Sequence, residues 1–392
     1  MKHDEIFKKI YGIAPDGELF CPYRICTLGA HVDHQGGRVN GFAINFGVTV
    51  SYRATGCADF EAVSKNFPDK VLFSLDSLKK GRVGDWADYI RGAAFALNEK
   101  YTLKTGILAY IDGDVSTGGL SSSAAVTVAF LSALAAANNI SLSENEMILT
   151  AQAAENKFVG VMCGTLDQSC VVLSRRDSLL YLDTECGEYR LIPSSLCAPP
   201  HKFAVFSSGV GRTLASSGYN SRRQECSDAA VMLAELAGIK KDGALRLCDI
   251  PRDDFERFGE RLPETLRNRA EHYFTETARA ALGAQAWQSG DIEKYGKLMR
   301  ESGESSIYKY ESGSRELIAL HEIINSADGV YGARFSGAGF GGCAVALINP
   351  DFADNISDYV SSRYLYEFPE LSGKYAFYLC ESADGFFAQS KG

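Results

Sequence analysis

Residues 107–138, ILAYIDGDVSTGGLSSSAAVTVAFLSALAAAN, decide the fold class. They begin with a short apolar run, residues 107–115, which reaches a glycine-rich turn and predicts a strand. The mostly apolar residues 121–138 predict a long helix. Near-alternation of β-branched and aromatic residues in FAINFGVTVSYRA (42–54) predicts a further strand. Strand-like and helix-like segments alternate from the start of the chain, which favours a mixed α and β architecture.

The turn within this stretch places Gly118 and Gly119 just before Ser121, Ser122 and Ser123. Glycines let the backbone approach a ligand closely, and the first turn of a helix offers free N–H groups that bind phosphate. The hydroxyls can cap the helix or bind phosphate and Mg²⁺. No lysine precedes the serines as in Walker A, and no serine stands in a G-x-S-x-G elbow. On these residues alone, an ordinary serine-capped helix remains an alternative.

The length and composition bound the organisation of the chain. With 392 residues, 46% of them hydrophobic, the chain can bury a core and is expected to form two domains. Proline and serine are concentrated in LIPSSLCAPPHK (191–202), so we place the domains at residues 1–198 and 199–392. The second domain is expected to be mainly helical, with a β-rich part around residues 331–348.

The charge and cysteine content exclude several classes of partner. The 40 basic and 49 acidic residues give a net charge of −9 without a basic run, which argues against nucleic acid. No stretch approaches the roughly 18 apolar residues of a membrane span, and the N-terminus does not resemble a signal peptide. We therefore expect a cytoplasmic protein, a monomer or weak homo-oligomer. Its 11 cysteines contain no C-x-x-C pair and are expected to be reduced core residues.

A second glycine-rich stretch, FSGAGFGG (335–342), satisfies the dinucleotide fingerprint G-x-G-x-x-G through Gly337, Gly339 and Gly342. That fingerprint requires a helix to follow, so that its N-terminus can hold the pyrophosphate. Here the strand-like CAVALI follows instead. We therefore predict a turn between two strands, either close to a ligand or simply tight.

Two groups of polar residues could carry chemistry. CPYRICTLGAHVDHQGG (21–37) clusters His31, Asp33 and His34, which could ligate zinc or form a polar site for a small molecule. Zinc needs three or four ligands, and no other His or Cys is obviously placed to help. Farther along, Glu155 on an expected helix and Asp167 after a Cys-Gly break could converge on one site.

Five stretches, in this order along the chain, resemble the galactokinase branch of the GHMP sugar and metabolite kinases. They are PYRICTLGAHVDHQGG (22–37), GGLSSSAA (118–125), AENKFVGVMCGTLDQ (154–168), GRTLASSGYNSRRQEC (211–226) and FSGAGFGGCAVAL (335–347). The resemblance implies an α+β fold with a ribosomal protein S5 domain 2-like N-terminal domain and a ferredoxin-like C-terminal domain. It places the active site between them, with ATP and Mg²⁺ as cofactors and a small-molecule sugar or uronic acid as substrate.

The resemblance also implies roles for single residues. Asp167 would be the base at the anomeric hydroxyl, and Arg24 would lie beside it and the γ-phosphate. The implied phosphate loop consists of Gly118, Gly119, Leu120, Ser121 and Ser122. The implied Mg²⁺ ligands are Ser123 and Glu155. The implied sugar contacts are Ala30, His31, Asp33, Gly164 and Tyr219. Trp86 corresponds to a residue that packs on adenine, although core packing is an alternative for it, and His34 is expected to be structural.

The chain departs from galactokinases at two positions of the first motif. Galactokinases carry a glutamate where this chain has Ala30, and a glycine where it has Tyr23. A carboxylate facing a C6 carboxylate would repel it by about 4 kcal/mol at 4 Å and an effective dielectric near 20. Its removal favours a uronic acid, and the motif looks more like that of galacturonokinases. Candidates for the cation that pairs the carboxylate are Arg212 and Arg222, which are equally compatible with surface positions.

We therefore expect D-galacturonate to be phosphorylated at C1, with D-galactose as the alternative substrate. A non-catalytic sensor of ATP and sugar is an alternative of another class, but it would be expected to have lost the phosphate loop or the catalytic pair. A zinc hydrolase at the histidine cluster is a third possibility. Mevalonate and homoserine kinases lack the N-terminal sugar signature.

Overall fold

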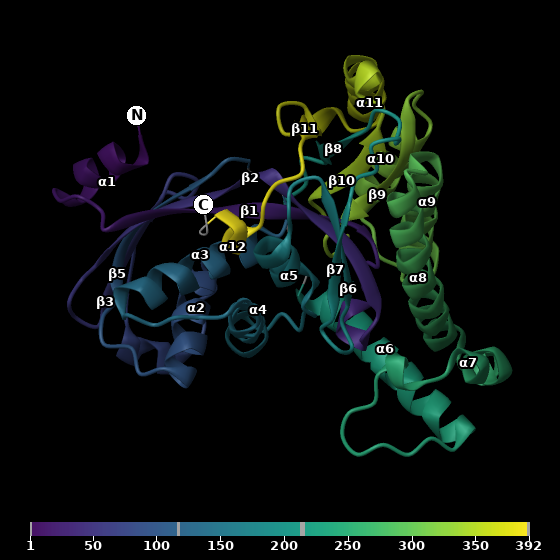
Figure 1. Cartoon of the computed structure of the whole chain (residues 1–392), viewed down its shortest axis with the longest axis horizontal. Helices are drawn as coiled ribbons and strands as arrows, with labels where there is room; N and C mark the ends of the chain where they lie inside the picture. Colours follow the sequence, from purple (N-terminus) through teal and green to yellow (C-terminus); the bar gives the residue numbers. More distant parts are fainter. Residues whose placement is uncertain (1, 116–117, 212–215, 390–392) are drawn as a thin grey trace.

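The computed structural model describes residues 2–115, 118–211 and 216–389. It contains two β-sheets, each covered by helices (Figure 1). Within the described residues, no helix combines the length and the apolar character needed to cross a membrane.

The first sheet has seven strands in the order β4-β3-β5-β2-β6-β7, and β1 also pairs with β2. All pairings are antiparallel except that of β3 with β5. The strands are β1 (Gly17–Leu28), β2 (Arg38–Ala54), β3 (Asp59–Ser64), β4 (Val71–Ser74), β5 (Ile107–Gly113), β6 (Ser178–Asp183) and β7 (Tyr189–Pro193). The register between β1 and β2 shifts just before Arg24, and such a bulge re-aims the side chains that follow it.

Helices of the first half cover one face of this sheet. They are α2 (Asp88–Lys100), α3 (Ser122–Ala137), α4 (Glu144–Ala153), a π-helical turn η3 (Ala154–Val159) and α5 (Leu166–Leu173). Helix α3 packs on both β1 and β2 and is buried around most of its circumference. A helix that is apolar on all sides belongs in the core, which explains its alanine- and leucine-rich sequence. The short α1 (His3–Tyr11) lies at the edge of the molecule (Figure 1).

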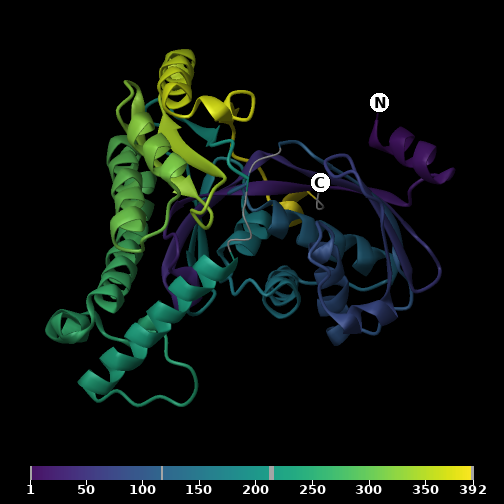
Figure 2. The same cartoon turned by 180° about the vertical axis from the view of Figure 1, so that it is seen from behind.

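The second sheet has four antiparallel strands in the order β11-β8-β10-β9. They are β8 (Lys202–Ser207), β9 (Val330–Ser336), β10 (Cys343–Ile348) and β11 (Ala376–Cys380). All six residues of β10 are buried, as expected for a central strand. The helices of this half are α6 (Ser216–Ala237), α7 (Arg252–Phe258), α8 (Glu264–Ser289), α9 (Ile292–Tyr308), α10 (Arg315–Asn325), α11 (Ala353–Glu367) and α12 (Phe386–Gln389). Helix α6 extends away from both sheets (Figure 2).

The two halves share a hydrophobic core. Phe42 of β2 packs against Phe203 of β8 and Trp287 of α8, with ring centroids 4.8 Å and 5.0 Å apart. The end of the chain returns to the first half, where α12 contacts α5 and Ser382 bridges to Ile44. The boundary expected at residues 198–199 falls in the connection between β7 and β8. It remains a prediction, because the last residues pack on the first sheet.

The structure confirms the strands expected at 42–54 and 107–115, the helix expected at 121–138 and the turn between two strands at 337–342. The expectation that the cysteines are core residues is only partly correct. All 11 are free, but Cys57, Cys186 and Cys197 are exposed, because each lies in a loop between strands rather than within an apolar element.

Candidate functional site

A cavity of about 280 Å³ lies where β1, η3, α5, α6 and the turn after β9 meet. It therefore receives side chains from both halves of the chain. The predicted site residues that line it are Arg24, Ala30, His31, Asp33, Ser123, Glu155, Asp167 and Tyr219. The structure thus brings together residues that are scattered over about 200 positions of sequence.

Arg24 and Asp167 form a direct ion pair in this cavity. Both Nε and Nη2 of Arg24 lie 2.7 Å from Oδ1 of Asp167. The Arg24 side chain is almost fully buried, whereas that of Asp167 is 27% exposed. Burial alone would lower the pKa of Arg24, but the charge of Asp167 outweighs it and raises the pKa above its usual value. The guanidinium is therefore charged, and the carboxylate beside it is open to the cavity.

The elements that carry this pair fix its geometry. Asp167 lies in the first turn of α5, where the helix dipole favours a negative charge. Arg24 is held by the backbone of the predicted phosphate loop. Its Nη1 donates to the Gly119 carbonyl at 2.8 Å, and its backbone N–H donates to the Leu120 carbonyl at 3.1 Å. Nη1 also donates to Ser336 Oγ at 3.2 Å. The second half of the chain therefore helps to hold Arg24.

Ser121 contacts the carboxylate of Asp167. It precedes α3 in a left-handed conformation with φ 53°, and its hydroxyl donates to Oδ2 of Asp167. Neither Ser121 nor its neighbours Gly118, Gly119, Leu120 and Ser122 line the cavity; Ser123 does. The loop lies behind the pair of Arg24 and Asp167, with which it forms hydrogen bonds, and its contact with phosphate remains a prediction.

The two glycine-rich loops pack directly on each other. A Cβ placed on Gly119 would lie 2.6 Å from the carbonyl oxygen of Ser336, and one on Gly342 would lie 2.6 Å from the carbonyl carbon of Gly118. Gly119 and Gly342 have φ of 91° and 100°, which favours glycine at both positions. The turn at 337–342 is therefore tight, and it is also close to the site, because Gly337 and Ala338 line the cavity.

Ser123 and Glu155 fit the ligands expected for Mg²⁺. Both are buried and both line the cavity. Glu155 lies on the π-helical turn η3, a feature that is frequent at functional sites, and accepts a hydrogen bond from Gln168 at 2.9 Å. A carboxylate and a hydroxyl oxygen are ligand types that Mg²⁺ takes together with phosphate oxygens.

The sugar signature forms a second polar group on the same cavity. Asp33 accepts from the backbone N–H groups of His34 at 3.0 Å and Leu166 at 3.3 Å. Burial, with a further contribution from Asp167, raises the pKa of Asp33 to about 6. Gly164 lies against this carboxylate, since a Cβ there would be 2.3 Å from Oδ2 of Asp33.

His31 adopts an unusual backbone conformation, with φ 63°. Its ring stacks on Tyr310 at 4.3 Å, and the ring of Tyr219 lies 6.5 Å away. Burial, and then the nearby His272, hold the pKa of His31 well below its ordinary value, so the ring is neutral and can both donate and accept. Tyr310 was not identified from the sequence, because this residue follows α9 (Ile292–Tyr308) and lies outside the recognised motifs.

The structure does not support a zinc site at the histidine cluster. Both ring nitrogens of His34 are engaged, Nε2 with the Tyr310 hydroxyl at 3.3 Å and Nδ1 with Gln35 at 3.1 Å. Burial and the positive charge of Arg223 lower the pKa of His34 to about 3. His34 is therefore structural, as expected.

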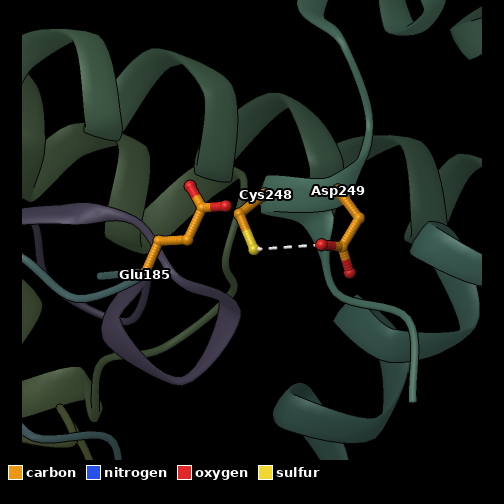
Figure 3. A group of neighbouring side chains, drawn as sticks. All are labelled: Glu185, Cys248 and Asp249. Atoms are coloured by element: carbon orange, nitrogen blue, oxygen red, sulfur yellow. Dashed lines mark hydrogen bonds between the residues drawn. The ribbon is translucent and has the colours of Figure 1, made fainter. Parts of the chain in front are cut away.

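In the part of the chain that the structure describes, a single group has metal-ligand spacing, and it lies elsewhere: Glu185, Cys248 and Asp249 (Figure 3). Its Asp249 is already bound to Lys241 at 2.6 Å. Burial raises the pKa of the Cys248 thiol to about 11, which disfavours the thiolate form that binds metals. His31, Asp33 and His34 do not form such a group in the described residues, so a zinc hydrolase at this cluster is not supported.

Trp86 does not line the cavity. It is half-buried against the core and stacks on Phe67 at 5.5 Å with an angle of 2° between the rings. Arg82 and Tyr89, on either side of it in sequence, line the cavity instead. Neither residue was identified from the sequence, although Tyr89 follows Trp86 by three positions in the stretch DWADYIRG (85–92). A role of Trp86 toward adenine remains a prediction.

Two arginines, Arg212 and Arg222, are the sequence-based candidates for the cation that pairs a C6 carboxylate near Ala30. Arg222 is 2.8 Å from Glu225 and 3.5 Å from Glu311, so its charge is already neutralised. Arg222 also does not line the cavity. Arg212 lies outside the described residues.

Comparisons with known proteins find similar sequences and structures along most of the chain. Residues 88–175 match the GHMP kinases N terminal domain, and residues 278–366 match the GHMP kinases C terminal model. A galacturonokinase of Arabidopsis thaliana is 38% identical over 390 residues, which cover 93% of this chain and 92% of that protein. A galactokinase of Roseiflexus sp. (strain RS-1) is 36% identical, with 97% and 95% covered. The crystal structure of Lactococcus lactis galactokinase complexed with galactose has a TM-score of 0.88 at 28% identity and covers 97% of each chain.

Proposed function

Because the chain belongs to the GHMP kinases and is a sugar kinase, we propose that it transfers the γ-phosphoryl group of ATP to the anomeric hydroxyl of D-galacturonate. The α+β fold expected from the resemblance, with GHMP kinase N- and C-terminal domains, is confirmed. The observation that carries the proposal is the contact of Arg24 and Asp167 at 2.7 Å in a cavity that Ala30 also lines.

Asp167 is the group that receives or orients the anomeric hydroxyl. Its Oδ1 is occupied by Arg24 and its Oδ2 by the Ser121 hydroxyl, and the carboxylate is partly open to the cavity. A hydroxyl held against this carboxylate can lose its proton as the new P–O bond forms. Arg24, buried and charged, stabilises the negative charge that develops on the attacking oxygen and the moving phosphoryl group.

The triphosphate lies at the start of α3. The first turn of this 16-residue helix offers free N–H groups at the positive end of the helix dipole. Ser123 and Glu155 would hold Mg²⁺, which when bound would neutralise phosphate charge. Because phosphoryl transfer depends mainly on positioning and electrostatics, these groups are a sufficient apparatus.

The sugar lies against His31, Asp33, Gly164 and Tyr219. The ionised Asp33 is a strong acceptor for sugar hydroxyls, and the neutral His31 both donates and accepts. A galactokinase would place a carboxylate at position 30, where this chain has a methyl group in the cavity wall. Since no negative charge repels a C6 carboxylate at this position, the site admits a uronic acid. The 38% identity to a galacturonokinase supports the same substrate, whereas the similarity to galactokinases makes D-galactose the alternative.

The experiment is a kinase assay on purified protein with ATP, Mg²⁺ and one sugar at a time. The panel contains galacturonate, galactose, glucuronate and N-acetylgalactosamine, and NMR of the product identifies the phosphorylated carbon. We expect galacturonate 1-phosphate to form with the highest kcat/KM. A higher kcat/KM for galactose would refute the substrate but keep the reaction, and phosphorylation of none of the four would refute both.

A further inference from the structure

The turn that carries Ala30 and His31 is held by a helix of the other half of the chain. The Gly29 N–H donates to Oε1 of Glu276 at 2.8 Å, and the Ala30 carbonyl lies 2.9 Å from Nε2 of His272. His272 and Glu276 are one turn apart on α8, and both are fully buried. Two consecutive residues of the turn, Gly29 and Ala30, are therefore held by one face of α8.

This turn has a backbone that needs such support. Gly29 and His31 have φ of 84° and 63°, so left-handed residues flank Ala30 on both sides. A left-handed conformation at a residue other than glycine persists only where its surroundings over-determine it. The contacts from α8 supply that constraint directly beside His31.

The hydrogen bonds of His272 fix its tautomer. The Ala30 carbonyl can only accept, so Nε2 of His272 carries the proton and donates to it. Nδ1 then holds the lone pair and accepts from the Ser305 hydroxyl at 2.9 Å. The ring is neutral, since burial lowers the pKa of His272 to about 4. Both ring nitrogens of His272 therefore form hydrogen bonds, one with Ser305 of α9 and one with the Ala30 carbonyl.

The carboxylate of Glu276 also has several hydrogen-bond partners. It accepts from Gly29, from the Ser302 hydroxyl and from Arg279, and Arg334 of β9 lies 3.5 Å from its Oε1. Burial would raise the pKa of Glu276, but the charges of Arg279 and Arg334 reverse this and lower it, so the carboxylate is charged. A buried, fully paired carboxylate beside the turn anchors the Gly29 amide rigidly.

We propose that His272 is a positioning residue for the sugar: by holding the Ala30 carbonyl, it sets where Ala30 and His31 stand in the cavity. The proposal rests on the proposed function, since it assumes that this part of the cavity receives the sugar. His272 does not line the cavity; besides its contact with the Ala30 carbonyl, its ring lies 5.0 Å from that of Tyr310 and 6.2 Å from that of His31.

Two conservative variants separate positioning from general stability. In His272→Gln the amide nitrogen takes the place of Nε2 and can still donate to Ala30, whereas in His272→Asn it takes the place of Nδ1 and cannot reach. We expect the Asn variant to raise the KM for the sugar about tenfold, as for a lost buried hydrogen bond, and to leave the KM for ATP within about twofold. The Gln variant should stay within about threefold of the parent for both substrates.

The matched control is His321→Asn, which changes another buried histidine of the same half, on α10 and away from the turn. It should leave both KM values unchanged. Hydrogen exchange of the amides at residues 29–31 provides a readout that needs no substrate: protection should fall in His272→Asn and persist in His272→Gln and His321→Asn. Should His272→Asn fail to fold, Ser305→Ala, which removes only the hydroxyl that fixes the ring, takes its place with the same expected direction.

Equal sugar KM values in the Asn and Gln variants, or a parallel rise in the KM for ATP, would overturn the proposal. Unchanged exchange at residues 29–31 in the Asn variant would also overturn it. Failure of the proposed function is recognised separately, because the parent protein would then phosphorylate none of the sugars while the exchange result still stood.

Discussion

Arg24 and Asp167 are separated by 143 positions, yet they share a hydrogen bond of 2.7 Å. Around them, each polar atom has a definite partner: Ser121 on one oxygen of Asp167, and Ser336 and Gly119 on Nη1 of Arg24. Such pre-arranged charges need little rearrangement when the reaction begins, which is how an enzyme lowers the barrier of a phosphoryl transfer.

Replacement of Asp167 by asparagine tests the proposed base. The amide keeps the size of the side chain but cannot take a proton, so we expect turnover to fall by about 10³-fold. Nucleotide binding, measured by calorimetry, should be retained. The control is Asp183→Asn, which changes an aspartate whose partner is the surface residue Arg38 and should leave turnover unchanged. Substantial turnover in the Asp167 variant would mean that this carboxylate only orients the hydroxyl.

Ala30 is the residue at which the choice of sugar can be altered. In Ala30→Glu, a carboxylate 4 Å from a C6 carboxylate would repel it by about 4 kcal/mol at an effective dielectric near 20. We expect kcat/KM for galacturonate to fall about 1000-fold, and kcat/KM for galactose to rise or stay constant. Ala30→Gln, which has the same size without the charge, should depress galacturonate much less. If the two variants lose galacturonate activity equally, bulk rather than charge explains the loss.

The pKa of Asp33 predicts a pH dependence of sugar use. Burial and the nearby Asp167 raise this pKa to about 6, so below pH 6 the carboxyl group becomes protonated and loses its charge. The neutral form is a poorer acceptor for sugar hydroxyls, so kcat/KM for the sugar should fall about tenfold per pH unit on the acid side of this value. Steady-state kinetics from pH 4.5 to about 8 would reveal this acid limb, the fall in kcat/KM below pH 6. In Asp33→Asn the limb near pH 6 should be absent, with low activity throughout.

Individual elements were predictable where one pattern sufficed. The strand, glycine turn and helix of residues 107–138 follow from local periodicity, and the strand after FSGAGFGG excludes a dinucleotide site. The contact between the two glycine loops could not be predicted, because it joins residues more than 200 positions apart. The side-chain direction of Ser121 was equally inaccessible, since it depends on where α5 places Asp167.

The loop contact carries its own prediction. In Gly342→Ala, the new Cβ would lie only 2.6 Å from the carbonyl carbon of Gly118. This contact is too short, so we expect the substitution to displace the start of α3. We expect the KM for ATP to rise about tenfold, since small displacements of positioning groups are costly. Gly373→Ala is the matched control: its φ of 80° imposes a similar backbone strain, but no atom lies within 4 Å of its added Cβ. Equal effects of both substitutions would assign the loss to strain alone.

At the scale of the whole molecule, the site exists only because the two halves meet. The cavity draws on both, and Ser336 and His272 of the second half hold Arg24 and Ala30 of the first. The sequence motifs predicted which residues gather there, through the resemblance to a known family. They did not predict Tyr310, Arg82 and Tyr89, because these residues reach the site through tertiary packing rather than through a motif.

The most direct measurement of the central claim is a competition between the two sugars. Equimolar galacturonate and galactose are supplied with limiting ATP and Mg²⁺, and ³¹P NMR integrates the two 1-phosphates, whose ratio reports the ratio of kcat/KM. We predict that galacturonate 1-phosphate exceeds galactose 1-phosphate by about tenfold or more, as expected when a carboxylate is absent from position 30. An excess of galactose 1-phosphate, or the absence of any anomeric phosphate, would contradict the account.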